Sequence, residues 1–275
     1  MTEEILEKFF YPRSLAIIGA TRTPGFGFGI PGFLKRQGWL KRTYLVNPKG
    51  GEIEGRKVYT SIEELPEGID LAVVMVRAEL VPGVLAELGR KGIRRVVIES
   101  AGFAEIGEKK RQEELLEVAR EYGIRIIGPN CVGVVNTENR FATIEVIDKA
   151  LEPGRVAIIA QSGVFGNILL DHLPEQGIKI AKVATLGNKI DLDEADFLEY
   201  FAQDERIRVI MIYQEGVKEG RSCISAVKST CRKKPVVILK SGRTPLGSKA
   251  TLSHTGSLSG EDRIYDGAYQ QAGAI

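Results

Sequence analysis

The sequence predicts an α/β protein made of two domains, each built around a parallel sheet. Short apolar runs alternate with longer amphipathic segments along the chain, which is the pattern of strands and helices in turn. The 275 residues are enough for two domains of ordinary size. A polar turn at residues 148–154 interrupts the alternation, and a second series of apolar runs follows it. We therefore expect a domain boundary there, with domains at residues 1–149 and 150–275.

The first domain opens with the apolar run Leu15-Ala16-Ile17-Ile18, which Gly19 closes. Uninterrupted apolar runs are typical of parallel strands, because such strands are buried on both faces. Further strands are expected at residues 43–46, 71–76, 94–98 and 124–127, with helices at residues 80–91 and 109–122. The second domain is expected to have strands at residues 155–160, 178–185, 208–213 and 235–240, again with helices between them.

The composition excludes several classes of function. The 38 basic and 36 acidic residues are interspersed and leave a formal net charge of +2, so no surface for nucleic acid is indicated. No stretch approaches the roughly 20 apolar residues of a membrane span, and the acidic start of the chain has no signal-peptide core. The three cysteines lack Cys-x-x-Cys spacing, which indicates neither a disulfide framework nor a zinc site. We expect a cytoplasmic protein with no metal site of its own and with neither nucleic acid nor membrane as a partner.

The turn after the first strand is rich in glycine and leads into a helical stretch, where a nucleotide phosphate can meet a helix amino terminus. It runs from Gly19 through Ala20, Thr21 and Arg22 to Gly25 but lacks strict G-x-G-x-x-G spacing, so a purely structural turn is the alternative. The second strand ends in Asn47-Pro48-Lys49, where an NAD-binding fold has an acidic residue for the ribose. Coenzyme A carries a ribose 3′-phosphate and a diphosphate, and Lys49 suits it better than NAD. An ordinary surface charge is the alternative for Lys49.

His254 is the strongest candidate for a reactive residue in this chain. It lies in Ser253-His254-Thr255-Gly256-Ser257, and the chain has only one other histidine, His172. Imidazole is nucleophilic at neutral pH, and hydroxyl groups and main-chain N–H groups can hold phosphate oxygens around it. The segment thus fits a histidine that accepts a phosphoryl or acyl group, with a solvated surface loop as the alternative. His172 is expected to be structural.

Five segments together resemble the alpha subunit, or the equivalent region, of the NDP-forming acyl-CoA synthetases, a family that includes succinyl-CoA synthetase. They are the Gly19 turn with Asn47-Pro48-Lys49, Ser100-Ala101-Gly102-Phe103-Ala104-Glu105, Gly128-Pro129-Asn130-Cys131-Val132-Gly133, Gln161-Ser162-Gly163, and Ser253-His254-Thr255-Gly256. The runs at residues 187–191 and 240–244 are similar to the ADP-forming, acetate-type branch. The resemblance covers the chain from residue 11 onward and implies a Rossmann-like CoA-binding domain followed by a flavodoxin-like domain.

The resemblance implies a role for each matching residue. His254 is expected to be phosphorylated in turnover, and Glu215 to hold its imidazole by a hydrogen bond. The helix start at Ser162, Gly163 and Val164, together with Thr255 and Gly256, is expected to bind phosphate, although Ser162 as a simple helix cap is the alternative. The coenzyme A contacts are expected from Gly19, Ala20, Thr21, Arg22, Lys49, Ser100 and Asn130. Cys131 is expected to be a small buried residue rather than a nucleophile.

The implied reaction interconverts acyl-CoA, ADP and phosphate with a free acid, coenzyme A and ATP, through an acyl phosphate and a phosphohistidine. We find no P-loop in the 275 residues. ADP or ATP and Mg²⁺ are therefore expected on a partner, a beta subunit with a nucleotide-grasp domain, in an alpha2beta2 hetero-oligomer. The chain ends at Ile275, where the pattern indicates another strand, so we expect either a truncated chain or a short subunit. Two alternatives stay open, a non-catalytic module that binds coenzyme A or acyl-CoA, and an NAD-dependent oxidoreductase.

Overall fold

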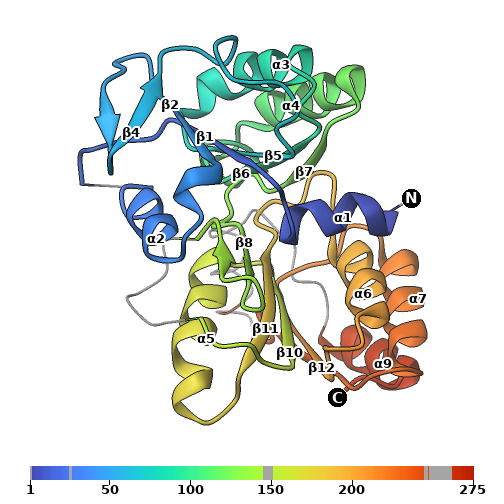
Figure 1. Cartoon of the computed structure of the whole chain (residues 1–275). Helices are drawn as coiled ribbons and strands as arrows, with labels where there is room; N and C mark the ends of the chain where they lie inside the picture. Colours follow the sequence, from blue (N-terminus) through green and yellow to red (C-terminus); the bar gives the residue numbers. More distant parts are fainter. Residues whose placement is uncertain (1, 25–26, 145–150, 245–246, 248–261) are drawn as a thin grey trace.

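The computed structural model describes residues 2–24, 27–144, 151–244, 247 and 262–275, and it has two sheet-based domains, one above the other in Figure 1. Both sheets are mainly parallel and covered by helices, so the predicted α/β class is confirmed. No described helix has the length and apolar character needed to cross a membrane.

The first domain is a seven-stranded sheet with the strand order β3-β4-β2-β1-β5-β6-β7. All neighbouring strands are parallel except β3 and β4, which pair antiparallel. The strands are β1 (Leu15–Ile18), β2 (Thr43–Val46), β3 (Glu52–Ile53), β4 (Arg56–Tyr59), β5 (Leu71–Val74), β6 (Arg95–Ile98) and β7 (Arg125–Ile127). The helices are α2 (Ile30–Arg36), α3 (Val81–Arg90) and α4 (Lys109–Tyr122), and α3 packs beside α4.

The second domain is a six-stranded sheet with the strand order β13-β12-β10-β11-β8-β9. Its strands are β8 (Val134–Asn136), β9 (Phe141–Ala142), β10 (Val156–Ala160), β11 (Ile180–Thr185), β12 (Val209–Gln214) and β13 (Val236–Lys240). Its helices are α5 (Gly163–Glu175), α6 (Glu194–Gln203), α7 (Gly220–Cys231) and α9 (Asp262–Ala272). Strands β10 to β13 are parallel, whereas β8 joins β11 antiparallel and β9 joins β8 antiparallel.

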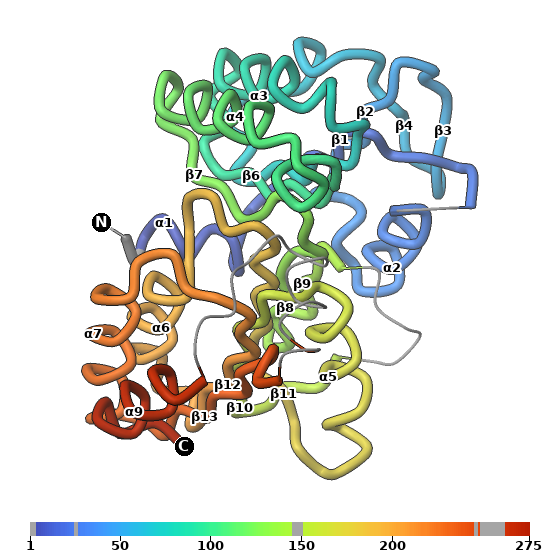
Figure 2. The backbone as a smooth tube through the Cα atoms, turned by 180° about the vertical axis from the view of Figure 1, so that it is seen from behind, coloured from blue at the N-terminus to red at the C-terminus, as the bar shows by residue number. Residues whose placement is uncertain are grey.

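The chain crosses between the two domains more than once. Strands β8 and β9 come before the expected boundary at residue 149 in sequence but belong to the second sheet. Helix α1 (Thr2–Phe10) precedes the first strand of the first domain, yet it packs on α6 of the second, as Figure 2 shows from behind. The ring of Phe10 stacks on Tyr200 of α6 with centroids 5.5 Å apart. The boundary at 149/150 stays a prediction.

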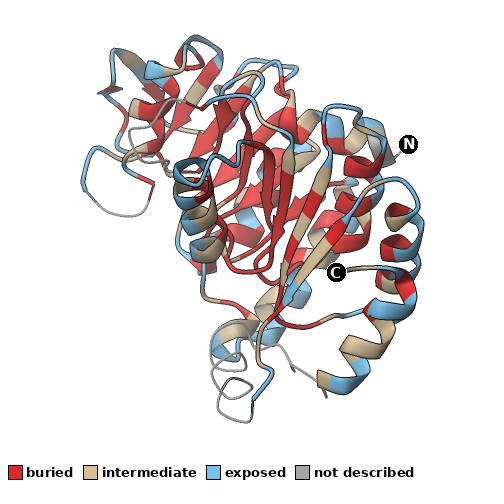
Figure 3. Cartoon of the chain, turned by 90° about the horizontal axis from the view of Figure 1, so that it is seen from below, coloured by how far each residue is buried: buried red, intermediate tan, exposed pale blue. Residues whose placement is uncertain are grey.

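The strands form the buried interior of the molecule, and the helices carry its exposed faces (Figure 3). Every residue of β1, β5 and β11 is buried, as expected for parallel strands covered on both sides. Two predicted strands were too long by two residues. β5 ends at Val74 instead of residue 76, because the chain leaves the sheet at Met75 to line a cavity, and β11 begins at Ile180 instead of residue 178.

Candidate functional site

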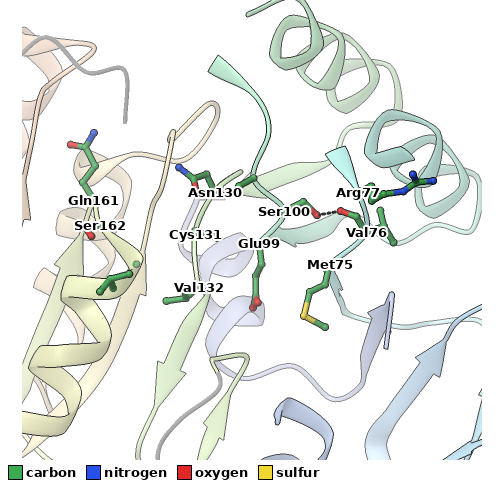
Figure 4. A pocket seen from close by; sticks show the side chains of 13 residues that line it. Met75, Val76, Arg77, Glu99, Ser100, Asn130, Cys131, Val132, Gln161 and Ser162 are labelled. Carbon is green, nitrogen blue, oxygen red and sulfur yellow. Dashed lines mark hydrogen bonds between the residues drawn. The ribbon is translucent and has the colours of Figure 1, made fainter. Parts of the chain in front are cut away.

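A cavity of about 450 Å³ opens between the two domains. Four segments line it, at residues 75–77, 99–101, 130–132 and 161–164. They follow the carboxyl ends of β5, β6, β7 and β10 respectively, which is where open parallel sheets bind their ligands. Figure 4 shows Met75, Arg77 and Ser100 on one side, Gln161 and Ser162 on the other, and Asn130 between them.

Two of the predicted coenzyme A contacts, Ser100 and Asn130, meet in this cavity. The hydroxyl of Ser100 donates to the carbonyl of Val76 over 2.6 Å (Figure 4), and the main-chain N–H of Asn130 donates to the carbonyl of Ser100 over 3.0 Å. Asn130 has a positive φ of 58°, a conformation that asparagine tolerates better than most residues. The structure thus places Ser100 and Asn130 in the lining of the same cavity as Ser162, Gly163 and Val164.

The remaining predicted coenzyme A contacts form a second group beside the cavity. The amide of Asn47 donates to the carbonyl of Ala20 over 2.8 Å, and the guanidinium of Arg22 donates to the carbonyl of Gly50 over 3.0 Å. These bonds join the turn of Gly19, Ala20, Thr21 and Arg22 to the loop of Lys49. Gly19 has a φ of 96°, and a Cβ there would lie 2.6 Å from the carbonyl oxygen of Met75, so the turn needs glycine.

Arg22 and Lys49 are exposed, so the two loops present two positive charges at the surface. Gly19 of the turn packs against Met75, which lines the cavity. None of the described residues that line the cavity comes from these loops. A ligand that touches both groups must therefore be extended, which suits a long molecule with phosphates at one end. Coenzyme A contact by these residues stays a prediction.

The start of α5 forms the wall of the cavity on the second domain. Ser162 is the N-cap residue, and its hydroxyl accepts from the main-chain N–H of Phe165 over 3.3 Å. The alternative role of Ser162 as a helix cap is therefore present in the structure. The N–H groups of Gly163 and Val164 lie in the first turn, where a helix supplies no carbonyl partner, and they line the cavity. The helix dipole adds positive potential there, so an anion is the ligand that this end favours.

Glu215 follows β12 directly and is 2% exposed. It is two residues from Tyr213, so their side chains leave the strand end on the same face. Burial raises the pKa of Tyr213, a hydrogen bond with Ser241 lowers it, and the negative charge of Glu215, followed by a hydrogen bond with its side chain, raises it. His254, Thr255 and Gly256 lie outside the described residues, so the predicted pairing of Glu215 with His254 stays a prediction.

Cys131 and Glu99 lie deep in the cavity. Cys131 is 3% exposed and its thiol donates to the carbonyl of Ile98 over 3.3 Å. Burial, and after it the negative charge of Glu99, raise the pKa of the thiol far above its usual range. A thiol that stays protonated is a poor nucleophile, which confirms the expected buried role of Cys131.

Glu99 is a carboxylate at this site that the sequence did not lead us to predict. It is 4% exposed and lines the cavity. Its signal was present in the sequence, because it stands between an apolar run and Ser100, at the end of a predicted strand. A carboxylate at that point is positioned to accept a proton within the cavity.

Comparison with known proteins identifies both domains. Residues 13–137 match the model of a CoA binding domain, and residues 153–275 match that of a succinyl-CoA ligase like flavodoxin domain. The chain belongs to the family of NDP-forming acyl-CoA synthetases and corresponds to the region that carries these two domains.

Its relatives include proteins named as acetate–CoA ligases (ADP-forming). The chain is 46% identical over 278 residues to the subunit alpha of such a ligase from Pyrococcus furiosus, covering 98% of this chain and 60% of that subunit. It is 45% identical to a ligase from Methanocaldococcus jannaschii, covering 98% of this chain and 38% of that protein. A solved structure described as a dinucleotide-forming acetyl-coenzyme A synthetase 1 from Ca. Korarchaeum cryptofilum, in complex with phosphate and ADP, superposes with a TM-score of 0.91 at 36% identity. That match covers 98% of this chain and 59% of that one. The chain thus spans less than two thirds of each of these relatives.

Proposed function

We propose that this chain is the coenzyme A-binding and histidine-carrying part of an ADP-forming acid–CoA ligase of the acetate type. The observation that carries the proposal is the cavity at the carboxyl ends of four strands. There the family's predicted coenzyme A contacts Ser100 and Asn130 face the start of α5. An acyl-CoA thioester held on one wall would meet an anion held on the other. The identity of 46% to a ligase subunit over 98% of this chain supports the same reaction.

The reaction that this arrangement fits has three balanced steps. A phosphate oxygen attacks the acyl carbon of acyl-CoA, so that the C–S bond breaks and acyl phosphate and coenzyme A form. A nitrogen of His254 then attacks the phosphorus of acyl phosphate, and the free carboxylic acid leaves. Finally the phosphoryl group passes from His254 to ADP and gives ATP. The helix N–H groups at Gly163 and Val164 would stabilise the phosphoryl oxygens, and the Glu215 carboxylate would orient the imidazole.

The nucleotide half of the reaction needs further protein. We propose that ADP or ATP and Mg²⁺ bind to a beta subunit with a nucleotide-grasp domain, and that the assembly is an alpha2beta2 hetero-oligomer in the cytoplasm. Support comes from the relatives named as alpha subunits and from the length of the relatives beyond this chain. A small carboxylic acid and phosphate complete the set of substrates.

The proposal is tested by labelling the chain with radioactive phosphate in the presence of acetyl-CoA. We expect an acid-labile, base-stable label on His254, because a phosphoramidate on imidazole hydrolyses in acid whereas phosphoserine and phosphothreonine survive it. His254→Asn keeps approximate size but cannot act as the nucleophile, so the label should disappear while coenzyme A affinity stays near the parent value.

A label that persists in His254→Asn, or that survives acid, would contradict the phosphohistidine mechanism. A parent chain that binds coenzyme A but takes up no label under any acyl-CoA would favour the alternative of a non-catalytic module. Binding of NADH in place of coenzyme A would favour the oxidoreductase.

A further inference from the structure

Glu215 and Gly216 form a segment whose four main-chain polar groups are all bonded by side chains. The N–H groups of Glu215 and Gly216 both donate to Oε1 of Gln161, over 3.0 and 3.1 Å. The ammonium of Lys240 donates to the carbonyl of Glu215 over 2.9 Å, and the ammonium of Lys189 donates to the carbonyl of Gly216 over 2.6 Å. Backbone groups mostly bond other backbone groups, so a segment held entirely by side chains is unusual.

The three side chains reach the segment from three different strand ends. Gln161 follows β10, Lys189 lies in the loop after β11, and Lys240 is the last residue of β13, while Glu215 itself follows β12. Strands β10 to β13 are parallel, so all four ends meet at one edge of the sheet. Gln161, Lys189 and Lys240 are 1%, 3% and 8% exposed. The segment is therefore fixed from several directions inside the protein. We call Gln161, Lys189 and Lys240 the clamp of this segment.

This arrangement uses costly groups. A buried ammonium loses its hydration, and that loss is tolerated only where hydrogen bonds or opposite charge replace the water. Lys189 also pairs with Glu194 and adopts a positive φ of 43°, which is strained for a residue with a side chain. Lys240 bonds the carbonyls of Glu215 and Ser241, and its ammonium lies 4.7 Å from the centroid of the Tyr265 ring. Each ammonium thus joins a carbonyl of the segment to at least one other fixed group, which ties the position of the segment to its surroundings.

We propose that Gln161, Lys189 and Lys240 are positioning residues that hold Glu215 in place for the histidine chemistry. The inference rests on the proposed function of Glu215 and adds three residues to it. With its own peptide groups and those of Gly216 bonded, Glu215 keeps only its side-chain torsions, so its carboxylate presents a narrow set of orientations. Misplacement of a catalytic group by about 1 Å can lower a rate roughly a hundredfold, so such a restriction has a kinetic value.

The test compares two lysines that bond main-chain carbonyls at opposite ends of β13. Lys240→Met removes the ammonium that bonds Glu215. Lys234→Met is the matched control, because Lys234 donates to the carbonyls of Phe201 and Asp204 just before β13 begins. The rate of label uptake from acetyl-CoA and radioactive phosphate is measured for both variants at several acetyl-CoA concentrations.

We expect Lys240→Met to lower the maximal labelling rate about tenfold or more, with the half-saturating acetyl-CoA concentration within about twofold of the parent value. Lys234→Met should label at the parent rate. Lys240→Arg keeps a charged donor and should recover part of the lost rate. Labelling of Lys240→Met at the parent rate would overturn the inference, and so would an equal loss in Lys234→Met.

A second measurement does not depend on the proposed function. Gln161→Met removes the acceptor of both N–H groups, so amide hydrogen exchange at Glu215 and Gly216 should become faster by about tenfold or more. Unchanged exchange would overturn the described clamp. If Lys240→Met does not fold, Gln161→Met takes its place in the comparison of labelling rates. If exchange responds as expected but the parent chain takes up no label, the proposed function fails, and the catalytic role of the clamp with it, while the clamp itself is retained.

Discussion

Charged side chains near the cavity differ in how freely they can move. Lys49 and Arg22 stand in solvent, whereas Glu99 and Glu215 are 4% and 2% exposed. An exposed ammonium keeps its hydration and can adjust to a phosphate that arrives from solution. A buried carboxylate is surrounded by packed atoms, which restrict its orientation. The exposed pair therefore suits recognition, and the buried pair suits chemistry.

This division predicts the effect of Lys49→Ala on coenzyme A binding. A lost charge-assisted contact of about 1.5 to 3 kcal/mol corresponds to roughly ten- to hundredfold in affinity. Calorimetry with coenzyme A and with dephospho-coenzyme A measures this, because only the first carries the 3′-phosphate. Lys41→Ala is a control, since Lys41 is also exposed but lies before β2 instead of after it. Equal affinities of parent and Lys49→Ala for coenzyme A would show that Lys49 does not bind it.

Sequence motifs predicted several residues of the cavity, but they did not predict the hydrogen bonds that hold Glu215 and Gly216. Ser100, Asn130 and Ser162 meet in one place because each follows a strand of a parallel sheet, and apolar runs reveal such strands. Lys189 and Lys240 stood in runs noted for their resemblance to the acetate-type branch, yet their bonds to Gly216 and Glu215 join residues 27 and 25 positions apart. Periodicity carries no information about such pairs, so the hydrogen bonds of the clamp could be found only in the structure.

At the scale of elements, buried parallel strands were predictable and short or antiparallel ones were not. β1, β2 and α4 have the expected bounds, since each has a clear apolar pattern and a glycine or polar end. β3, β8 and β9 have two or three residues each, too few for any period to show. Helix α1 was not predicted, although Leu6, Phe9 and Phe10 recur at helical spacing. Its packing on α6, almost 200 residues along the chain, could be found only in the structure.

Two described side-chain caps in the second domain, on α5 and α6, allow a matched prediction. Ser162 caps α5 beside the cavity, and Asp193 caps α6 by accepting from Ala195 over 2.8 Å. Replacing either residue with alanine should lower the free energy of unfolding by about 1 kcal/mol, measured in urea. Only Ser162→Ala should also raise the phosphate concentration needed for half-maximal labelling, by roughly five- to tenfold, if the hydroxyl bonds phosphate as well. An unchanged phosphate dependence would leave Ser162 as a cap alone.

The connection between α1 and the first sheet predicts a pH dependence. Asp70, 5% exposed, accepts from Lys8 of α1 over 2.9 Å and from the guanidinium of Arg13 over 3.0 Å. Burial acts to raise the pKa of Asp70, but the bonds from Arg13 and Lys8 outweigh it and lower the pKa to about 2. Because the unfolded chain has a pKa near 3.9, this carboxylate stabilises the fold above pH 4, and the stabilisation is lost as the pH falls from about 4 to about 2.

Asp70→Asn should therefore lower the free energy of unfolding by about 2 kcal/mol at pH 6. The difference between parent and variant should shrink as the pH approaches 3, because the parent carboxyl begins to bind its proton in the unfolded state. Urea unfolding at both pH values provides the comparison. A difference that is constant between pH 6 and pH 3 would mean that the ion pairs do not control the pKa of Asp70.

At the scale of the whole molecule, the two domains share buried structure instead of meeting only at a surface. A single apolar cluster includes Leu15 and Ile17 of β1, Phe10 of α1, and Phe197 and Phe201 of α6. A backbone N–H of the second domain, at Ile190, also bonds the carbonyl of Gly128 in the first. Buried contacts thus connect the two domains that carry the walls of the cavity, which suits the proposed meeting of a thioester and an anion there.

The whole molecule also predicts what this chain does not do alone. The cavity and the described edge of the second sheet carry the proposed sites for the thioester and phosphate, and the sequence has no P-loop for a nucleotide. After labelling with acetyl-CoA and radioactive phosphate, and removal of free phosphate, addition of ADP and Mg²⁺ should release no labelled ATP from the 275-residue chain. Addition of a beta subunit from a related ADP-forming ligase should release labelled ATP with matching loss of label from His254, whereas His254→Asn mixed with the same subunit should give none. Labelled ATP from the chain alone would place a nucleotide site within these residues and remove the need for a partner.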